Sequence, residues 1–263
     1  MIPQTIRSAV RQALPPKAVN TYRTFRDVRG IASLLGFLAS DGVNLSFSQR
    51  ADMVRKIFNV STSMYCPHTN EEIVTVVRDI LTMPSSVEGA IVECGCCKGG
   101  SSSKFSHAAR IMNRKLILFD SFEGIPDNTE AHTKTIFGDE IVGHFAGGTF
   151  LGTLDEVQAN IRACGDIGVC EFIKGWFDKT MPDFKRPLAM VFLDVDLAES
   201  TKTCLKYLYP LLSPGGIVWS QDGHLPLVIE AFDDDDFWRN EVGVPKPRIE
   251  GLGTRQLIRI QKT

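Results

Sequence analysis

The feature that most constrains the fold is an alternation of short apolar runs with helix-like stretches, beginning at about residue 88. The runs are almost continuously apolar, which is typical of parallel strands buried on both faces of a sheet. This order predicts an α/β fold with a doubly wound, mostly parallel sheet. The expected strands span 90–94, 115–120, 170–174, 188–196 and 216–222, with a closing strand over 254–262. The expected helices span 101–112, 153–164, 199–212 and 225–240.

Two regions fall outside this alternation. Residues 31–85 have helical periodicity, whereas residues 121–152 are rich in glycine and have no clear period. A long irregular insertion in a compact sheet is more often a binding loop or a lid than filler. We therefore expect an N-terminal helical extension over 1–58 and one domain over 59–263, with the insertion as its lid.

The composition is that of an ordinary globular protein, with 43% hydrophobic and 23% charged residues and a net charge of -2. This balance argues against nucleic-acid binding. No apolar stretch reaches the roughly 18 to 20 residues that span a bilayer, since the best candidate, 31–39, is about half that length. The seven cysteines lack the regular spacing of a secreted disulfide framework. We expect a reduced, cytoplasmic protein without a transmembrane segment.

The first 30 residues are basic, with six Lys and Arg residues against the single acid Asp27. Ile2, Ile6, Val10 and Leu14 recur at helical spacing, which predicts a short amphipathic helix. Such an arm packs on the body of the protein, packs on a second subunit of a homo-oligomer, or contacts a membrane surface peripherally. The sequence leaves these alternatives open.

The first expected strand runs into the glycine-rich segment VECGCCKGG, residues 92–100. In an open α/β sheet, ligands bind beyond the carboxyl ends of the strands. Glycines let the backbone turn sharply and approach a ligand, and the next helix offers free N–H groups. The spacing fits neither the G-x-G-x-x-G of a dinucleotide fold nor a P-loop, which disfavours a nicotinamide oxidoreductase. The residues that remain as binding candidates are Glu93, Gly95, Gly99, Gly100 and Ser101.

Three cysteines, Cys94, Cys96 and Cys97, lie in the same segment. A zinc site would need spaced pairs of ligands, and the other cysteines are scattered. We interpret these thiols as small residues that fit a crowded turn between strand and helix.

Acidic residues end the neighbouring strands as well. Asp120 closes the second strand, where related folds place a carboxylate on ribose hydroxyls. Asp194 and Asp196 end the fourth strand and Asp222 ends the fifth, so these carboxylates should meet at one rim. Such a cluster suits Mg²⁺, which could hold two adjacent hydroxyls and lower the pKa of one. Helix capping and turn formation are the alternative interpretation.

Five segments, in order, resemble the macrocin O-methyltransferase (TylF) family of class I S-adenosylmethionine (SAM)-dependent methyltransferases. They are VECGCCKGGSS, FDSFEGIPD, KGWFDKTMP, FLDVDLAEST and LYPLLSPGGIVWSQD. The resemblance covers about residues 59–222. It implies a Rossmann-like fold with a seven-stranded sheet, SAM as cofactor, and commonly Mg²⁺. It also implies methyl transfer to a hydroxyl of a sugar or glycosylated small molecule.

The resemblance further implies roles for individual residues. The residues expected around the cofactor are Glu93, Gly95 and Ser101 near its methionine part, Gly99 and Gly100 in the same loop, Asp120 with Ser121 and Phe122 at the ribose, Trp176 at the adenine, and Met64 and Tyr65 in a segment that closes over it. The expected metal ligands are Asp194 and Asp222, and Asp196 is the candidate general base.

The chain departs from the family at the end of the fifth strand. The family usually has two successive aspartates there, followed by an aromatic residue, whereas this chain has Gln221-Asp222-Gly223-His224. Gln221 or His224 could complete the metal site, or metal binding is weakened. His224 could instead be the base, because a histidine titrates near neutral pH. The missing carboxylate leaves a second function open, that of a catalytically altered SAM-binding protein in a glycan or natural-product assembly complex.

Overall fold

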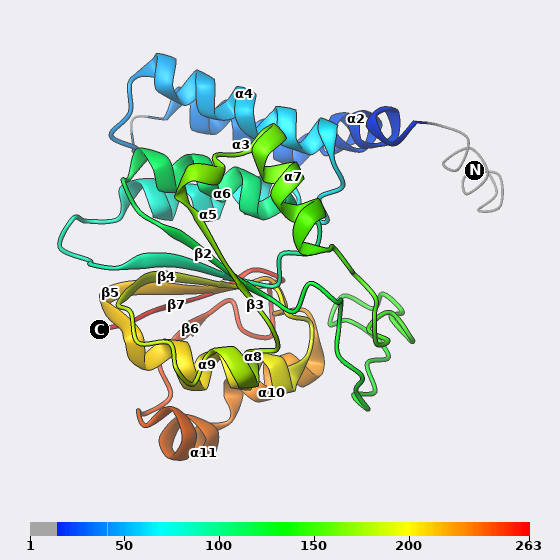
Figure 1. Cartoon of the computed structure of the whole chain (residues 1–263), viewed down its shortest axis with the longest axis vertical. Coiled ribbons are helices and arrows are strands. Elements are labelled where there is room, and N and C mark those ends of the chain that lie inside the picture. Colours follow the sequence, from blue (N-terminus) through cyan, green and yellow to red (C-terminus); the bar gives the residue numbers. More distant parts are fainter. Residues whose placement is uncertain (1–14, 41) are drawn as a thin grey trace.

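The computed structural model describes residues 15–40 and 42–263 and has a seven-stranded sheet at its centre (Figure 1). The strand order is β3-β2-β1-β4-β5-β7-β6. Neighbouring strands from β3 to β5 pair in parallel, and β7 pairs antiparallel with both β5 and β6. The predicted doubly wound, mostly parallel sheet is confirmed. The strands are β1 (Ala90–Cys94), β2 (Leu116–Asp120), β3 (Cys170–Lys174), β4 (Leu188–Leu193), β5 (Leu212–Ser220), β6 (Ile249–Glu250) and β7 (Ile258–Gln261).

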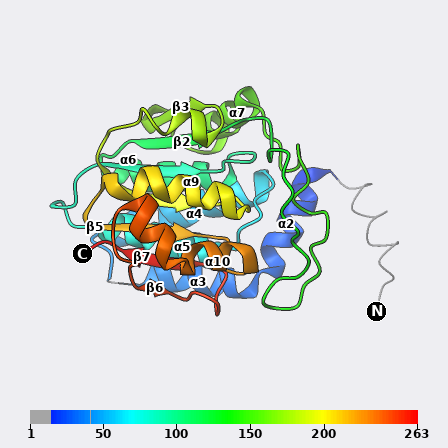
Figure 2. The ribbon, with the colours of Figure 1, turned by 90° about the horizontal axis from the view of Figure 1, so that it is seen from below.

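Helices cover both faces of this sheet (Figures 1 and 2). The helices from α2 to α7 lie on one face, with α2 to α4 stacked outside α5 and α6, and the helices from α8 onward lie on the other face. The first group is α2 (Pro16–Arg26), α3 (Val28–Ala39), α4 (Phe47–Ser63), α5 (Asn70–Thr82), α6 (Gly100–Ile111) and α7 (Leu154–Cys164). The second group is α8 (Phe177–Thr180), α9 (Ala198–Leu208), α10 (Pro226–Asp233) and α11 (Asp235–Phe237). None of the described helices is both long and apolar enough to span a bilayer.

Each central strand supplies side chains to two separate cores, one on each face of the sheet. In β1, Ile91 packs in the core under α5 and α6. Its neighbour Val92 packs in the core against α9 and α10. Because successive side chains of a strand point to opposite faces, a strand covered on both sides must be apolar throughout. This arrangement explains the continuous apolar runs in the sequence.

The N-terminal helices share the core on their side of the sheet. Helix α4 begins with a capping box formed by Ser46 and Gln49, and it continues without a break past residue 58. Its residues Met53 and Ile57 are buried in the same cluster as the side chains of β1 and β4. The predicted division between 58 and 59 therefore falls inside a continuous helix. The predicted basic helix between Ile2 and Leu14 lies outside the described residues.

Several predicted boundaries are wrong. The segment SPGG, expected to stop a helix over 199–212, lies inside β5, and Gly215 adopts a φ of +79° there. The strand expected over 188–196 ends at Leu193. The helix expected over 225–240 breaks at Asp234, whose carboxylate caps α11, and a π-helical turn follows over Trp238–Val242. In each case a residue with special backbone or capping chemistry overrides the apolar pattern.

The insertion over 121–152 contains an isolated bridge between Lys134 and Glu140 but neither a helix nor a strand. It leaves the carboxyl end of β2 and forms the looped segment beside α2 in Figure 2. Glu130 fastens it to the opposite layer, because its carboxylate oxygens accept hydrogen bonds from the N–H groups of Ala198 (2.9 Å) and Glu199 (3.0 Å) at the start of α9. The insertion therefore borders the edge of the sheet where strands β1, β2, β4 and β5 end.

Candidate functional site

A cavity of about 500 Å³ lies at the carboxyl ends of these strands. Segments far apart in the sequence form its wall: the glycine-rich loop, the ends of β2, β4 and β5, the start of α8, and the insertion. Among the predicted site residues, those that line it are Gly95, Asp120, Ser121, Trp176, Asp194, Asp196, Gln221, Asp222 and His224. The insertion contributes the apolar side chains of Ile125, Ile141, Phe145 and Phe150, together with His144.

The glycine-rich loop is pressed against the end of β4. Gly95 has a φ of +84°, and a Cβ atom there would lie 1.9 Å from the carbonyl oxygen of Asp194. A side chain at this position is therefore excluded by the protein backbone itself. Gly99 also has a positive φ, +79°, at the N-cap of α6, and a Cβ there would lie 3.1 Å from Val157 of α7. Gly95 thus brings the loop close to the acidic end of β4, and Gly99 brings it close to α7.

Asp120 ties the end of β2 to the same loop. Its carboxylate accepts hydrogen bonds from the backbone N–H of Cys96 (2.6 Å) and of Phe122 (2.7 Å). Burial raises the pKa of Asp120 above its usual range, although these N–H groups oppose the rise. The carboxylate is therefore held in a fixed orientation at the cavity wall.

Glu93 and Ser101 lie beneath the loop and not on the cavity wall. The Glu93 side chain is fully buried, and Ser101 Oγ donates a 2.5 Å hydrogen bond to its Oε1 atom. The Oε2 atom has no hydrogen-bond partner among the described residues. Burial raises the pKa of this carboxyl to about 7. Glu93 is thus a carboxyl with spare acceptor capacity directly behind the glycine loop.

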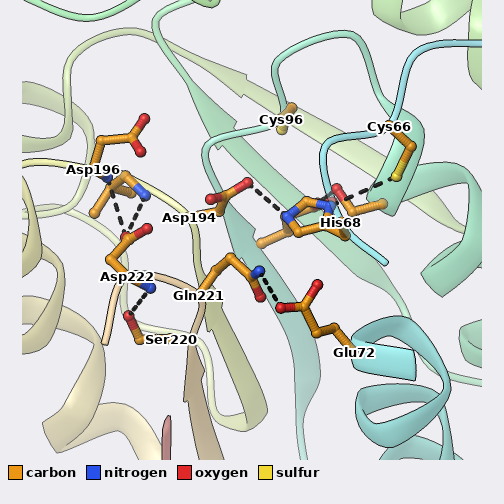
Figure 3. Close-up of polar contacts among 12 residues, drawn as sticks. Cys66, His68, Glu72, Cys96, Asp194, Asp196, Ser220, Gln221 and Asp222 are labelled. Atoms are coloured by element: carbon orange, nitrogen blue, oxygen red, sulfur yellow. Dashed lines mark hydrogen bonds and ion pairs between the residues drawn. The ribbon is translucent and has the colours of Figure 1, made fainter. Parts of the chain in front are cut away.

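Three aspartates converge at the other side of the cavity. Ligand oxygens of Asp194, Asp196 and Asp222 lie within 4.8 Å of one another. Asp222 Oδ2 accepts hydrogen bonds from the backbone N–H of Val195 (3.0 Å) and Asp196 (3.1 Å), as Figure 3 shows. These bonds close the turn after β4, in which Asp196 has a φ of +61°. The predicted meeting of the acids from two neighbouring strands is present.

Burial and mutual repulsion alter the titration of these acids. Burial, reinforced by Asp222 and Asp194, raises the pKa of Asp196 well above its usual range. Burial and the charge of Asp194 raise the pKa of Asp222 to about 7. A divalent cation between the oxygens would relieve this repulsion, and hard oxygen ligands are those that Mg²⁺ prefers. The donor set therefore fits such an ion.

His68 is a residue of the cavity wall that the sequence analysis missed. Its Nε2 atom lies 2.9 Å from Asp194 Oδ2 (Figure 3). Burial alone would lower the pKa of His68, but the charge and hydrogen bond of Asp194 outweigh burial and raise that pKa well above its usual value. The only sequence signal was its position directly after the segment TSMYCP, because a lone histidine carries no pattern.

Gln221 and His224 differ in what they offer the cavity. The Gln221 side chain turns toward α5, where its Nε2 donates to Glu72 Oε1 (2.9 Å), while the metal-capable group consists of the three aspartates (Figure 3). His224 has a buried Nδ1 atom without a partner among the described residues. Burial lowers the pKa of His224, so the ring is neutral at neutral pH.

Of the remaining predicted cofactor residues, Trp176 lines the cavity, whereas Phe122, Met64, Tyr65 and Gly100 are not among its lining residues. Trp176 is 37% exposed and forms part of its rim. Phe122 and Met64 are buried in the packed interior. Tyr65 stands beside Arg23, whose guanidinium lies 4.8 Å from the centre of the tyrosine ring. Gly100 begins α6 and faces the backbone and side chain of the 65–66 segment.

The sequence model of the family described as "Macrocin-O-methyltransferase (TylF)" matches residues 47–253. The chain belongs to the macrocin-O-methyltransferase family. The match begins at the first residue of α4, so it includes part of the helical layer as well as strands β1 to β6, but not β7.

Curated members of the family resemble the chain over part of its length. It is 33% identical over 179 residues to the "8-demethyl-8-(2,3-dimethoxy-alpha-L-rhamnosyl)-tetracenomycin-C 4'-O-methyltransferase" of Streptomyces olivaceus, covering 65% of this chain and 66% of the relative. It is 32% identical over 158 residues to the "Demethyldecarbamoylnovobiocin O-methyltransferase" of Streptomyces niveus, covering 58% of each. The match thus spans less than two thirds of the length of these relatives.

Solved structures show the same fold. The O-methyltransferase NovP superposes with a TM-score of 0.62 at 24% identity, covering 77% of this chain and 84% of NovP. The calicheamicin methyltransferase CalS11 superposes with a TM-score of 0.59 at 17% identity, covering 94% of this chain and 93% of CalS11. The predicted Rossmann-like class I methyltransferase fold is confirmed.

Proposed function

We propose that this protein is a SAM-dependent O-methyltransferase that methylates a hydroxyl of a sugar or glycosylated small molecule with the help of Mg²⁺. The observation that carries the proposal is the single cavity that joins the glycine-rich loop and Asp120 to the cluster of three aspartates. The cofactor would bind at one side of this cavity and the acceptor at the other. The relatives support it, since both are O-methyltransferases and the one from Streptomyces olivaceus is named for a rhamnosyl compound.

The residues on the cofactor side fit SAM chemically. Asp120 offers a fixed carboxylate to the two ribose hydroxyls, and the rim position of Trp176 suits an adenine ring. Glu93 Oε2 is a buried acceptor without a partner among the described residues, behind the loop that would hold the methionine part. SAM, when bound, supplies the electrophilic methyl group.

The acceptor side supplies orientation and a base. A bound Mg²⁺ would be held by Asp194 and Asp222, beside Asp196, and would lower the pKa of a substrate hydroxyl. We assign Asp196 as the group that receives the hydroxyl proton. It lines the cavity at the turn after β4, between the proposed cofactor side and the proposed acceptor side. His224 is the second candidate for this role, since its ring is neutral at neutral pH. The apolar insertion would cover the acceptor and exclude water.

We also propose a cellular compartment and partners for the protein. All seven cysteines are free thiols, which suits a reducing compartment, so we place the reaction in the cytoplasm. The partners that we propose are a small glycoside acceptor and a second copy of the chain, packed through the N-terminal helices.

The test is transfer of label from methyl-labelled SAM to a panel of free, nucleotide-linked and aglycone-linked sugars, with and without Mg²⁺. We expect label on at least one glycoside, a dependence on Mg²⁺, and loss of transfer in the Asp194→Asn variant. Absence of transfer to every glycoside while SAM binds would contradict the proposal.

One observation favours a second function. Gln221 stands where the family usually has an aspartate, and its amide is engaged by Glu72. A catalytically altered SAM-binding protein in a glycan or natural-product assembly complex would bind SAM without transferring its methyl group. The same panel separates the two functions.

A further inference from the structure

A second cavity, of about 350 Å³, lies between α2 and the loop that precedes α5. It shares only the short segment Pro67–His68 with the first cavity among their lining residues. Its lining includes the arginines Arg23 and Arg26 and the half-buried thiol of Cys66. Cys66 therefore faces a space that the proposed methyl transfer does not use.

The polar contacts of Cys66 set it apart from an ordinary buried thiol. Lys104 Nζ lies 3.4 Å from its Sγ, and His68 Nδ1 lies 3.7 Å from it (Figure 3 shows the contact with His68). Lys104 is fully buried, and the only other partner recorded for its ammonium among the described residues is Asn70 Oδ1, at 3.3 Å. A buried ammonium is costly unless an anion compensates it. The Cys66 sulfur is the atom placed to be that anion.

The electrostatics of the cluster favour the ionised thiol. Burial by itself raises the pKa of the Cys66 thiol, but the charge of Lys104 and the hydrogen bond and charge of His68 outweigh burial and lower it to about 6. By contrast, burial raises the pKa of Cys97 to about 11 and that of Cys170 to about 12. A thiolate, not a thiol, is the reactive form of cysteine.

We propose that Cys66 is a modification site at which a hydroperoxide, entering through the second cavity, oxidises a Lys104-paired thiolate to a sulfenic acid. The sulfur attacks one peroxide oxygen, the S–O bond forms, and the O–O bond breaks. Sulfur loses two electrons to the peroxide, whose second oxygen leaves as hydroxide, or as an alkoxide from an organic hydroperoxide, and is neutralised by a proton from the buffered solvent. No further reductant or cofactor is needed for this step.

Oxidation at this position would disturb the start of α6. A Cβ atom added to Gly100 would lie 3.0 Å from Cys66 Cβ and 3.2 Å from its Sγ, so the thiol packs directly against that glycine. An additional oxygen on sulfur would press on the helix that follows the glycine-rich loop. This consequence rests on the proposed function, because it requires the loop to hold SAM.

The first experiment measures the thiolate without reference to SAM. Iodoacetamide alkylation of the whole chain is followed by peptide mass mapping across a range of pH. We expect Cys66 to reach half of its maximal rate near pH 6 and to react about tenfold or more faster than Cys97 at neutral pH, since a higher thiolate fraction outweighs lower intrinsic nucleophilicity. A half-maximal rate near pH 9, or Cys66 reacting no faster than Cys97, would overturn the proposal.

The charged groups around Cys66 define the control variants. Lys104 from α6 and His68 from its own loop face the sulfur, and Arg23, Arg26 and Asp27 from α2 and its end line the same cavity. Lys104→Met should move the alkylation midpoint upward by about one pH unit or more, because the compensating cation is lost. The matched variant Lys56→Met, at a half-buried lysine paired with Asp52, should leave it unchanged. If Lys104→Met does not fold, the pH dependence of Cys66 alkylation in the wild-type chain tests the proposal by itself.

The second experiment uses hydrogen peroxide itself. Dimedone trapping should place a sulfenic acid adduct on Cys66 and none on Cys97, and an adduct distribution without Cys66 would overturn the proposal. Oxidised protein should bind SAM about tenfold or more weakly, while peroxide should leave the affinity of the Cys66→Ser variant unchanged. Equal SAM affinity before and after oxidation of Cys66 would refute the coupling to the loop. Failure of untreated protein to bind SAM would instead contradict the proposed function and leave the alkylation result standing.

Discussion

At the scale of single residues, the site depends on carboxylates whose surroundings differ. Asp120 is held by two backbone N–H groups, whereas Asp196 makes its backbone contact through its own N–H and leaves its carboxylate toward the cavity. Both line one cavity, and under the proposed function the first would bind the cofactor and the second would accept a proton. This difference lets a single substitution separate cofactor binding from chemistry.

Asp196→Asn should remove proton transfer while keeping the turn intact. Asparagine tolerates the left-handed backbone of position 196 as aspartate does, so the fold should be unaffected. Loss of a general base typically costs about 10² to 10⁴ in rate. We expect kcat to fall within that range and the Kd for SAM to change less than about threefold, measured by single-turnover kinetics and calorimetry. A loss of SAM affinity as large as the loss of kcat would show that Asp196 is not the base.

Glu93→Gln should stabilise the protein well above pH 7. The folded pKa of about 7 exceeds the ordinary 4.5, so the folded state holds the proton more tightly than the unfolded state. Stability of the wild type therefore declines as pH rises from 4.5 through 7, and the full penalty is present above 7. Removing the charge should raise the free energy of unfolding by about 1 to 3 kcal/mol there, measured with urea. A gain of the same size well below pH 4.5 would contradict this account.

At the scale of elements, a few hydrogen bonds hold the insertion in place: those of the Glu130 carboxylate to α9, and one from the Ile136 N–H to the His224 carbonyl oxygen (3.0 Å). Glu130 caps α9 from a segment without helices or strands, and it also lies 3.0 Å from His132 Nε2. A lid that is fastened by a few hydrogen bonds can open at modest cost. The insertion is therefore suited to admit and then cover an acceptor.

Glu130→Ala should loosen this fastening. Loss of a cap of this kind costs about 1 kcal/mol, so the amide hydrogens of Ala198 and Glu199 should exchange about fivefold faster in hydrogen-exchange mass spectrometry. Glu140→Ala is the matched control, since Glu140 lies in the same insertion and is exposed beside Lys134. Equal exchange in the two variants would show that Glu130 does not hold the insertion.

At the scale of the whole molecule, the sequence predicted those features that hydrophobic periodicity determines, such as the limits of some strands. The limits of β1 and β3 are those expected, although β1 is buried along its whole length and β3, at the edge of the sheet, is half-buried and ends at the exposed Lys174. The limits of β5 could not be found, since Pro and Gly residues normally end a strand and here lie within one. The acids at the strand ends were predictable from topology alone. His68 was not, because only tertiary packing brings it across to Asp194, 126 residues away in sequence.

The glycine-rich loop was likewise predictable only in part, because tertiary contacts leave no local pattern in the sequence. The spacing of its glycines predicted a ligand-binding loop. The carbonyl oxygen of Asp194 excludes a side chain at Gly95, and no local sequence pattern reveals that contact. The three cysteines of the loop are consistent with their interpretation as small turn residues, since burial raises the pKa of each and none belongs to the metal-capable group. The reactive thiol that we propose lies elsewhere, at Cys66.

The central claim is that the cavity between the glycine-rich loop and the three aspartates binds SAM. Calorimetric titration of SAM into the wild-type chain tests it most directly, with Asp120→Ala as the site variant and Asp155→Ala, at an exposed acid on α7, as the matched control. We predict one SAM per chain, an affinity about tenfold or more weaker in Asp120→Ala, and an unchanged affinity in Asp155→Ala. Absence of binding to the wild type, or equal affinity of the wild type and Asp120→Ala, would contradict the account.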